Sequence, residues 1–138
     1  MTNNNITHIR DQINTYFDNK KQEHDKKRSK NNRKIYGKYY QSPKWKELRA
    51  YKFANTPYCE VCDRQSIVKE CDEIHHKIPF LTGKTEEEKW SLLLDYNNLI
   101  SCCSYHHHLF HDYLRRYNKD QATIDELIDY EKKYEEFL

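Results

Sequence analysis

Apolar residues along the chain recur at the spacing of an amphipathic helix in five stretches and follow a short strand pattern in two. The helical stretches are residues 6–17, 43–52, 85–96, 104–118 and 123–137. The strand-like runs are residues 72–80, which Pro79 interrupts, and residues 98–102. A repeat of about 3.6 residues predicts a helix and an alternation predicts a strand, so this order indicates a small α+β protein.

Hydroxyl-bearing residues stand where four of these helices are expected to begin. Ser42 precedes Pro43, a pair typical of a helix whose first turn holds a proline. Thr85 and Thr123 each precede a glutamate by three positions, which is the spacing of a capping box. Ser104 is expected to cap the histidine-rich helix that follows it. Residues 56–65, TPYCEVCDRQ, predict a turn-rich knuckle.

Charge is distributed unevenly along the chain. Residues 20–52 hold thirteen lysines and arginines against three acids, whereas residues 120–138 hold seven acids against two lysines. We therefore divide the chain into a basic N-terminal arm over residues 1–38, a folded domain over residues 39–118 and an acidic C-terminal helix over residues 119–138. Within the arm, residues 20–34 are expected to be flexible or weakly helical. The basic segment favours binding to a polyanion such as DNA, although charge runs also occur as solvated faces.

The chain carries no apolar run of signal-peptide length and no stretch that approaches a membrane span. The sequence therefore predicts a cytoplasmic protein with no membrane partner, in which the five cysteines are reduced. In a reducing compartment, clustered cysteine and histidine favour metal binding over disulfides. Since only 36% of residues are hydrophobic, a metal would reinforce a modest core.

Cys59 and Cys62 form a C-x-x-C pair, which is typical either of a redox site or of half a zinc site. A redox site would need a strand–helix–strand unit around the pair, and the pattern predicts none. Cys103 and His106 supply a second pair at the same spacing. Four such ligands would close a tetrahedral shell around a structural zinc and leave no position for water.

Two alternatives to this zinc site remain open in the sequence. The cysteines could be buried free thiols, or Cys71 or Cys102 could replace one of the four ligands. We assign Cys71 and Cys102 as ordinary cysteines.

Four further histidines predict a second site. His107 and His111 lie four positions apart and would share one face of a helix, where both can hold one cation. His75 and His76 are adjacent on an expected strand, so their side chains point in different directions. One can bind the metal while the other acts as a general base, with Asn98 placed to orient the second imidazole.

The segments EIHHKIPF, YNNLISC and CSYHHHLFH, together with the preceding YYQSPKWKELRAYKFANTPYCEVC, resemble the HNH endonuclease family. The match covers roughly residues 39–112 and is similar to the zinc-stapled members found in phages and bacteria. The resemblance implies a small ββα-metal (HNH) core with a structural zinc knuckle and flanking helices. It also implies a phage or prophage protein that acts in the cytoplasm of a bacterial or phage-infected host cell.

Each site residue receives a role from this resemblance. His75 and His107 would bind a catalytic cation, and His111 would complete its shell or contact the scissile phosphate. His76 would be the general base, positioned by Asn98. The structural zinc would be held by Cys59, Cys62, Cys103 and His106. The implied activity is metal-dependent hydrolysis of DNA phosphodiester bonds to 5′-phosphate and 3′-hydroxyl ends.

His75 is a departure from the family pattern, because many members carry aspartate at this position and the colicin-type nuclease domains carry a histidine pair. The resemblance implies two cofactors, one structural Zn²⁺ and one catalytic divalent cation. Because of His75, the catalytic ion can be Mg²⁺, Mn²⁺, Co²⁺, Ni²⁺ or Zn²⁺. Three imidazole ligands shift the preference away from Mg²⁺ and toward the other four ions.

DNA is the expected partner, and its phosphates would be contacted by basic residues on both sides of the core. These residues are Lys26, Lys27, Arg28, Lys30, Arg33, Lys34, Arg115 and Arg116. Two other functions are compatible with the pattern: a zinc-stabilised DNA-binding module that no longer cuts, and a zinc scaffold for protein partners. The sequence indicates neither the oligomeric state, nor the sequence specificity, nor whether one strand or two would be cut.

Overall fold

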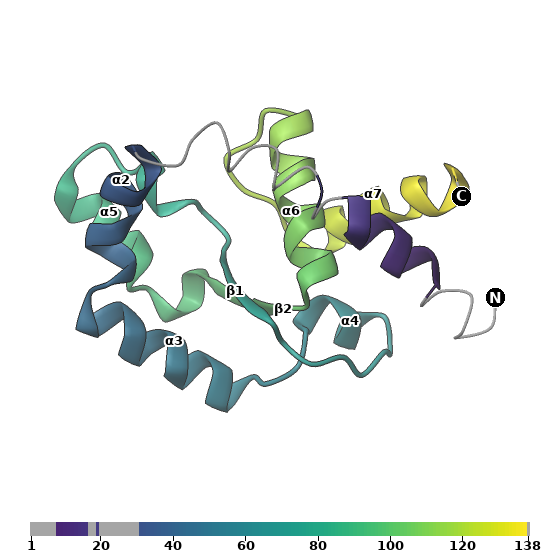
Figure 1. The fold of residues 1–138 in the computed structure, drawn as a ribbon, viewed down its shortest axis with the longest axis horizontal. Helices are drawn as coiled ribbons and strands as arrows, with labels where there is room; N and C mark the ends of the chain where they lie inside the picture. Colours follow the sequence, from purple (N-terminus) through teal and green to yellow (C-terminus); the bar gives the residue numbers. More distant parts are fainter. Residues whose placement is uncertain (1–7, 17–18, 20–30, 138) are drawn as a thin grey trace.

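The computed structural model describes residues 8–16, 19 and 31–137 of the chain (Figure 1). The fold is mixed α+β and mostly helical. A helix over residues 8–16 comes first in the chain. The labelled elements follow in this order: α2 (Asn31–Tyr40), α3 (Pro43–Asn55), α4 (Glu60–Arg64), β1 (Glu73–His76), α5 (Glu86–Leu93), β2 (Leu99–Cys102), α6 (Ser104–Arg116) and α7 (Ile124–Phe137).

The two strands form an antiparallel sheet at the centre of the molecule. His75 pairs with Ile100 and His76 pairs with Leu99, while Glu73 pairs with Cys102. Both strands contact α3 and α6, and in Figure 1 α6 rises above the strands while α3 runs below them. Because successive side chains of a strand point to opposite faces, the two helices receive alternate residues of the same strands.

Buried residues form two clusters that follow this alternation. The cluster on the α6 side contains Ile100 and Cys102 of β2 together with Phe110 of α6. The cluster on the α3 side contains Leu99 of β2 and Trp45 of α3. A chain with little apolar material thus builds two small cores that share one thin sheet.

A buried ion pair joins α3, α4 and β2. Lys52 of α3 is almost fully buried, and its Nζ lies 3.1 Å from the carboxylate of Glu60 in α4. The same carboxylate accepts a hydrogen bond of 2.7 Å from the backbone N–H of Ser101 in β2. The pairing fixes α4, which carries one cysteine and is capped by another, against the sheet.

Three of the four expected helix caps are confirmed. Ser42 accepts from the N–H of Trp45, and Thr85 and Thr123 accept from the glutamate N–H groups three positions on. The expectation for Ser104 is wrong: this residue is the first of α6, and Cys103 occupies the capping position without a side-chain hydrogen bond.

Two other expectations are corrected in detail. The strand expected over residues 72–80 ends at His76, and Phe80–Thr82 form a 3₁₀ turn. The knuckle at residues 56–65 contains the short helix α4.

The helix expected over residues 6–17 is confirmed for residues 8–16, which are the described part of that range. Residues 8–16 form a helix whose Ile13 is buried in the cluster on the α6 side, and α2 begins at Asn31. The arm boundary at residue 38 stays a prediction, and Lys26, Lys27, Arg28 and Lys30 lie outside the described residues. Within the described ranges, no helix combines the length and apolarity needed to cross a membrane.

The two glycines offer a matched test of the packing. A Cβ on Gly83 would lie 2.7 Å from the backbone nitrogen of Lys89 in α5, whereas a Cβ on Gly37 in α2 would meet nothing within 4 Å. We expect Gly83→Ala to lower the free energy of unfolding by about 1–3 kcal/mol, because α5 must move. Gly37→Ala should raise it by about 0.5–1 kcal/mol, because alanine favours a helix. Urea unfolding of both variants measures this, and equal stabilities would contradict the packing described for α5.

Candidate metal centres

Three cysteines and one histidine converge where α4 meets the start of α6. Cys59 caps α4, Cys62 lies within it, Cys103 precedes α6 and His106 lies in its first turn; all four are buried. The Nδ1 atom of His106 lies 3.3 Å from the sulfur of Cys103, 3.4 Å from that of Cys62 and 3.5 Å from that of Cys59. The sulfurs of Cys62 and Cys103 are 3.9 Å apart.

These separations fit the edges of a tetrahedral zinc site. With Zn–S bonds of about 2.3 Å and a Zn–N bond of about 2.0–2.1 Å, a tetrahedron has S···S edges of about 3.8 Å and N···S edges of about 3.5 Å. The cluster of Cys59, Cys62, Cys103 and His106 could therefore hold a structural zinc. Such an ion would join α4 to α6, which are far apart in sequence.

The remaining two cysteines do not take part in this cluster. The thiol of Cys71 donates to the carbonyl of Glu73, and the thiol of Cys102 donates to the carbonyl of Ile100. Burial raises the pKa of Cys102 well above its usual value. Cys102 is therefore a neutral buried thiol that packs in the core.

Without a metal, electrostatics inside the cluster favour a thiolate at Cys59 and a protonated ring at His106, whose proton a metal would displace. Hydrogen bonds from the thiols of Cys103 and Cys62 lower the pKa of Cys59 far below its usual range. Burial disfavours a charged ring at His106, but the neighbouring sulfur of Cys103 and the carboxylate of Glu131 raise its pKa overall. Since metals bind thiolates, the cluster already stabilises the charge that the first ligand must carry.

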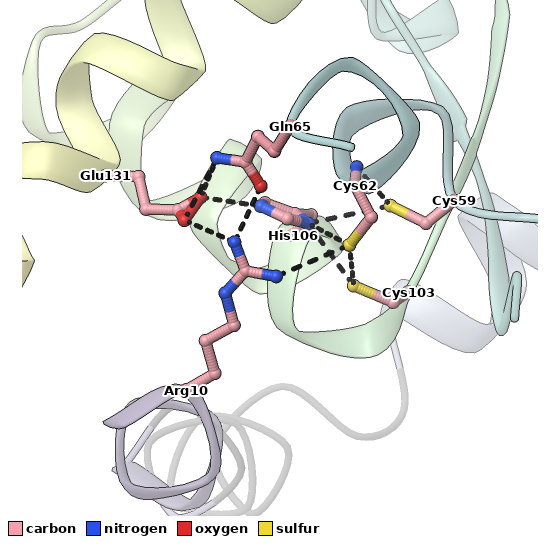
Figure 2. A network of polar contacts seen from close by, with 7 residues as sticks. All are labelled: Arg10, Cys59, Cys62, Gln65, Cys103, His106 and Glu131. Atoms are coloured by element: carbon pink, nitrogen blue, oxygen red, sulfur yellow. Dashed lines mark hydrogen bonds and ion pairs between the residues drawn. The ribbon is translucent and has the colours of Figure 1, made fainter. Parts of the chain in front are cut away.

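A buried carboxylate contacts the ring nitrogen of His106 that faces away from the three sulfurs. Glu131 of α7 is 1% exposed, and its Oε1 lies 2.7 Å from Nε2 of His106 (Figure 2). Burial would raise the pKa of Glu131, but His106 and Arg10 lower it, so the group remains a carboxylate. A carboxylate on the far nitrogen fixes the ring and leaves Nδ1 free to bind a metal.

Sequence reasoning did not identify Glu131, although one signal was present. Ile124, Leu127, Ile128 and Glu131 occupy successive positions of one helical face, so the glutamate continues an apolar stripe. A charged residue at a position expected to be buried requires a partner. The identity of that partner depends on how α7 packs, which the pattern does not contain.

A second set of ligands lies between β1 and α6. One ring nitrogen each of His75, His107 and His111 lies within 4.8 Å of the others. The Nε2 atoms of His107 and His111 are 3.1 Å apart, and the ring of His75 stacks on Phe110 at 4.4 Å. The structure thus brings together the three histidines that were expected to share a cation.

His75 carries the observation that tests this fit. The residue is 3% exposed, and its Nε2 atom is buried without a hydrogen-bond partner among the described residues. Burial and the neighbouring rings of His111 and His107 hold its pKa well below the usual value, so the ring is neutral. A buried nitrogen lone pair beside two further imidazoles suits a divalent cation.

His76 points to the opposite face of β1. Its ring packs 4.9 Å from that of Trp45 and 5.3 Å from that of Phe80. Nε2 lies 3.2 Å from the carbonyl oxygen of Leu93. Because a carbonyl only accepts, Nε2 carries the proton and Nδ1 keeps the lone pair. Burial lowers the pKa of His76, which also favours the neutral ring.

His75 and His76 nevertheless reach a common cavity of about 110 Å³. His107 and His111 line the same space, which α2 borders through the exposed rings of Tyr36 and Tyr40. All four imidazoles of the second site therefore line one cavity.

Asn98 acts on this region through the backbone. Its Oδ1 accepts from the N–H of Ile78, and its Nδ2 donates to the carbonyls of Ile78 and Leu92. The expected direct bond to the ring of His76 is replaced by this arrangement. Asn98 ties the chain after β1 to the end of α5, where Leu93 holds His76.

The basic residues expected to contact DNA are only partly described. Arg115 and Arg116 are exposed at the end of α6, and each pairs with Asp112, at 3.2 Å and 3.9 Å. Lys34 is exposed on α2, while the side chain of Arg33 lies outside the described part.

No protein-family model, curated protein or solved structure matches this chain.

The zinc site is tested by removing one ligand. We expect the wild type to bind one zinc per chain at the cysteine cluster and Cys62→Ser to lose it, because three ligands leave the shell open. The melting temperature should fall by roughly 10 °C or more, since structural zinc supplies several kcal/mol of folding free energy. Elemental analysis and thermal unfolding followed by circular dichroism measure both effects.

Cys71→Ser is the matched control for this experiment. Its thiol lies outside the cluster and donates to a backbone carbonyl, which a hydroxyl can also do. Loss of zinc from this variant, or retention of zinc by Cys62→Ser, would show that the cluster is not the binding site.

Proposed function

We propose that this protein is a metal-dependent HNH-type endonuclease that hydrolyses DNA to 5′-phosphate and 3′-hydroxyl ends. The observation that carries the proposal is the common cavity of His75, His76, His107 and His111. The order β1, β2, α6 also supports the proposal, because it agrees with the order of strands and helix that a ββα-metal core implies.

His76 is the general base in this proposal. Its Nε2 proton is engaged by Leu93, so Nδ1 is the nitrogen that would accept a proton from water. The resulting hydroxide would attack phosphorus in line with the departing 3′ oxygen. A positioned base of this kind contributes about 10²–10⁴-fold to a rate.

His75, His107 and His111 would hold the catalytic cation. A divalent ion bound there stabilises negative charge on phosphoryl and leaving oxygens. Three imidazoles make Mn²⁺, Co²⁺, Ni²⁺ or Zn²⁺ better suited than Mg²⁺. Asn98 is a positioning residue, because it fixes the backbone that holds His76 and does not face the substrate.

DNA would approach along the face that carries the cavity. Arg115 lies four residues after His111 on α6, one turn farther along the helix. A basic side chain one helical turn beyond His111 can contact phosphates that flank the scissile phosphate.

The decisive experiment compares His76→Ala with His108→Ala on supercoiled plasmid. Each chelator-treated protein receives Mg²⁺, Mn²⁺, Co²⁺, Ni²⁺ or Zn²⁺ separately. We expect His76→Ala to lose at least about 10²-fold in cleavage rate while it retains plasmid binding, because only the base is removed. His108 pairs with Asn14 outside the cavity, so His108→Ala should cut like the wild type.

The outcomes separate the candidate functions. If the folded wild type binds plasmid but does not cut it with any of the five ions, the protein is a DNA-binding module. If it neither cuts nor binds in a salt-dependent manner, a scaffold for protein partners replaces the proposal. Equal cleavage by wild type and His76→Ala would overturn the role of His76.

Phosphate contact by α6 is tested separately. We expect Arg115→Gln combined with Arg116→Gln to weaken DNA binding equally for all sequences. The slope of log affinity against log salt should become shallower by about 0.9 for each phosphate that the variant no longer neutralises. Lys132→Gln combined with Lys133→Gln removes two charges from acidic α7 and serves as the control. If the two arginine substitutions leave the salt dependence of DNA binding unchanged, DNA does not contact the end of α6.

A further inference from the structure

Arg10, on the helix over residues 8–16, reaches into the cysteine cluster (Figure 2). Its guanidinium lies 3.5 Å from the sulfur of Cys62 and 3.1 Å from the carboxylate of Glu131. It also donates a hydrogen bond of 2.6 Å to Gln65, which follows α4. The side chain is only 13% exposed. A buried arginine placed against a metal-binding sulfur requires a physical explanation.

Metal binding changes the charge that Arg10 faces. Cysteine binds zinc as the thiolate. Three thiolates and one Zn²⁺ leave the cluster with one net negative charge. The guanidinium of Arg10 would then donate to a sulfur of a cluster that carries the opposite net charge.

The helix over residues 8–16 attaches to the domain through one small group of contacts. Ile13 packs in the cluster on the α6 side, and Asn14 contacts Ser104 and His108 of α6, at 3.4 Å and 2.8 Å. The guanidinium of Arg10 also lies over the ring of Tyr105 at 5.2 Å. These contacts to Ser104, Tyr105 and His108 fall on the first turns of α6, and the other contacts of Arg10 are with Cys62 of the cluster and with Gln65 and Glu131 beside it. Any force that orders the cluster therefore also orders the surface on which this helix rests.

We propose that Arg10 is the counter-ion of the zinc–thiolate cluster, and that metal binding and docking of the N-terminal helix stabilise each other. Coupling of this kind is reciprocal: if zinc strengthens docking by some factor, the docked Arg10 strengthens zinc binding by the same factor. Glu131 extends the coupling to α7, because it contacts both Arg10 and His106. One metal site thus secures the first and the last helices of the described chain.

Arg10→Met tests this inference, with Arg64→Met as the control. Methionine keeps much of the apolar stem but removes the charge and the donors. Arg64 also pairs with a carboxylate of α7, Asp125 at 2.9 Å, but it is exposed and does not reach the cluster. Zinc affinity is measured by competition with a chromophoric chelator, and hydrogen exchange of the zinc-loaded proteins reports on docking.

We expect Arg10→Met to weaken zinc binding by about 10- to 100-fold, the range seen when residues that support metal ligands are removed. The amides of residues 8–16 should exchange faster while those of the sheet stay protected. Arg64→Met should change neither quantity. Zinc affinities of the two variants within a factor of about two of each other would overturn the proposal, as would unchanged exchange in Arg10→Met.

Arg10→Lys and Arg64→Lys supply the same comparison if Arg10→Met does not fold. Lysine keeps the positive charge but cannot contact Cys62, Gln65 and Glu131 at once. We expect weaker zinc binding by several-fold for Arg10→Lys only, and equal affinities would reject the role of Arg10. The inference does not depend on nuclease activity, since neither measurement uses DNA.

Discussion

The meeting of α4 and α6 at the cysteine cluster is the constraint on which the rest of the structure depends. The sheet of the described chain has two strands, and the apolar core is divided in two. Burial of apolar side chains alone therefore stabilises the contact between α4 and α6 only weakly. A zinc shell would supply strong, directional bonds where apolar surface is scarce. It would also fix the first turn of α6, the helix that carries His107 and His111 toward β1.

The alternation of a single strand gives two adjacent histidines different chemistry. His75 faces α6, where burial leaves its Nε2 without a partner among the described residues and two imidazoles lie close by. His76 faces α3, where aromatic rings enclose it and a carbonyl selects its tautomer. No difference in residue type separates them. The pleat of β1 and the side on which each helix packs decide which histidine is suited to a cation and which to a proton.

Hydrogen bonds and ion pairs between buried polar residues join segments of the domain that the small apolar core does not hold together. Glu131, Arg10 and Gln65 form one network around His106. Asn98 satisfies two backbone groups of Ile78 after β1 and the carbonyl of Leu92 in α5. Buried groups of this kind are costly when alone and stabilising when fully paired. They also join segments from both ends of the described chain, so the positions of the terminal helices and of the candidate metal site are physically linked.

The sequence by itself determined the features that depend on near neighbours. The order of α3, β1, α5, β2, α6 and α7, the caps at Ser42 and Thr85, and the paired ligand spacings all follow from patterns within a few residues, whereas α2 and α4 were not expected. Tertiary structure alone decided that Glu131 supports His106, that Arg10 reaches the cluster, and that Asn98 binds backbone instead of the His76 ring. These contacts join residues far apart in the chain, and their geometry depends on how whole helices pack, which no local pattern encodes.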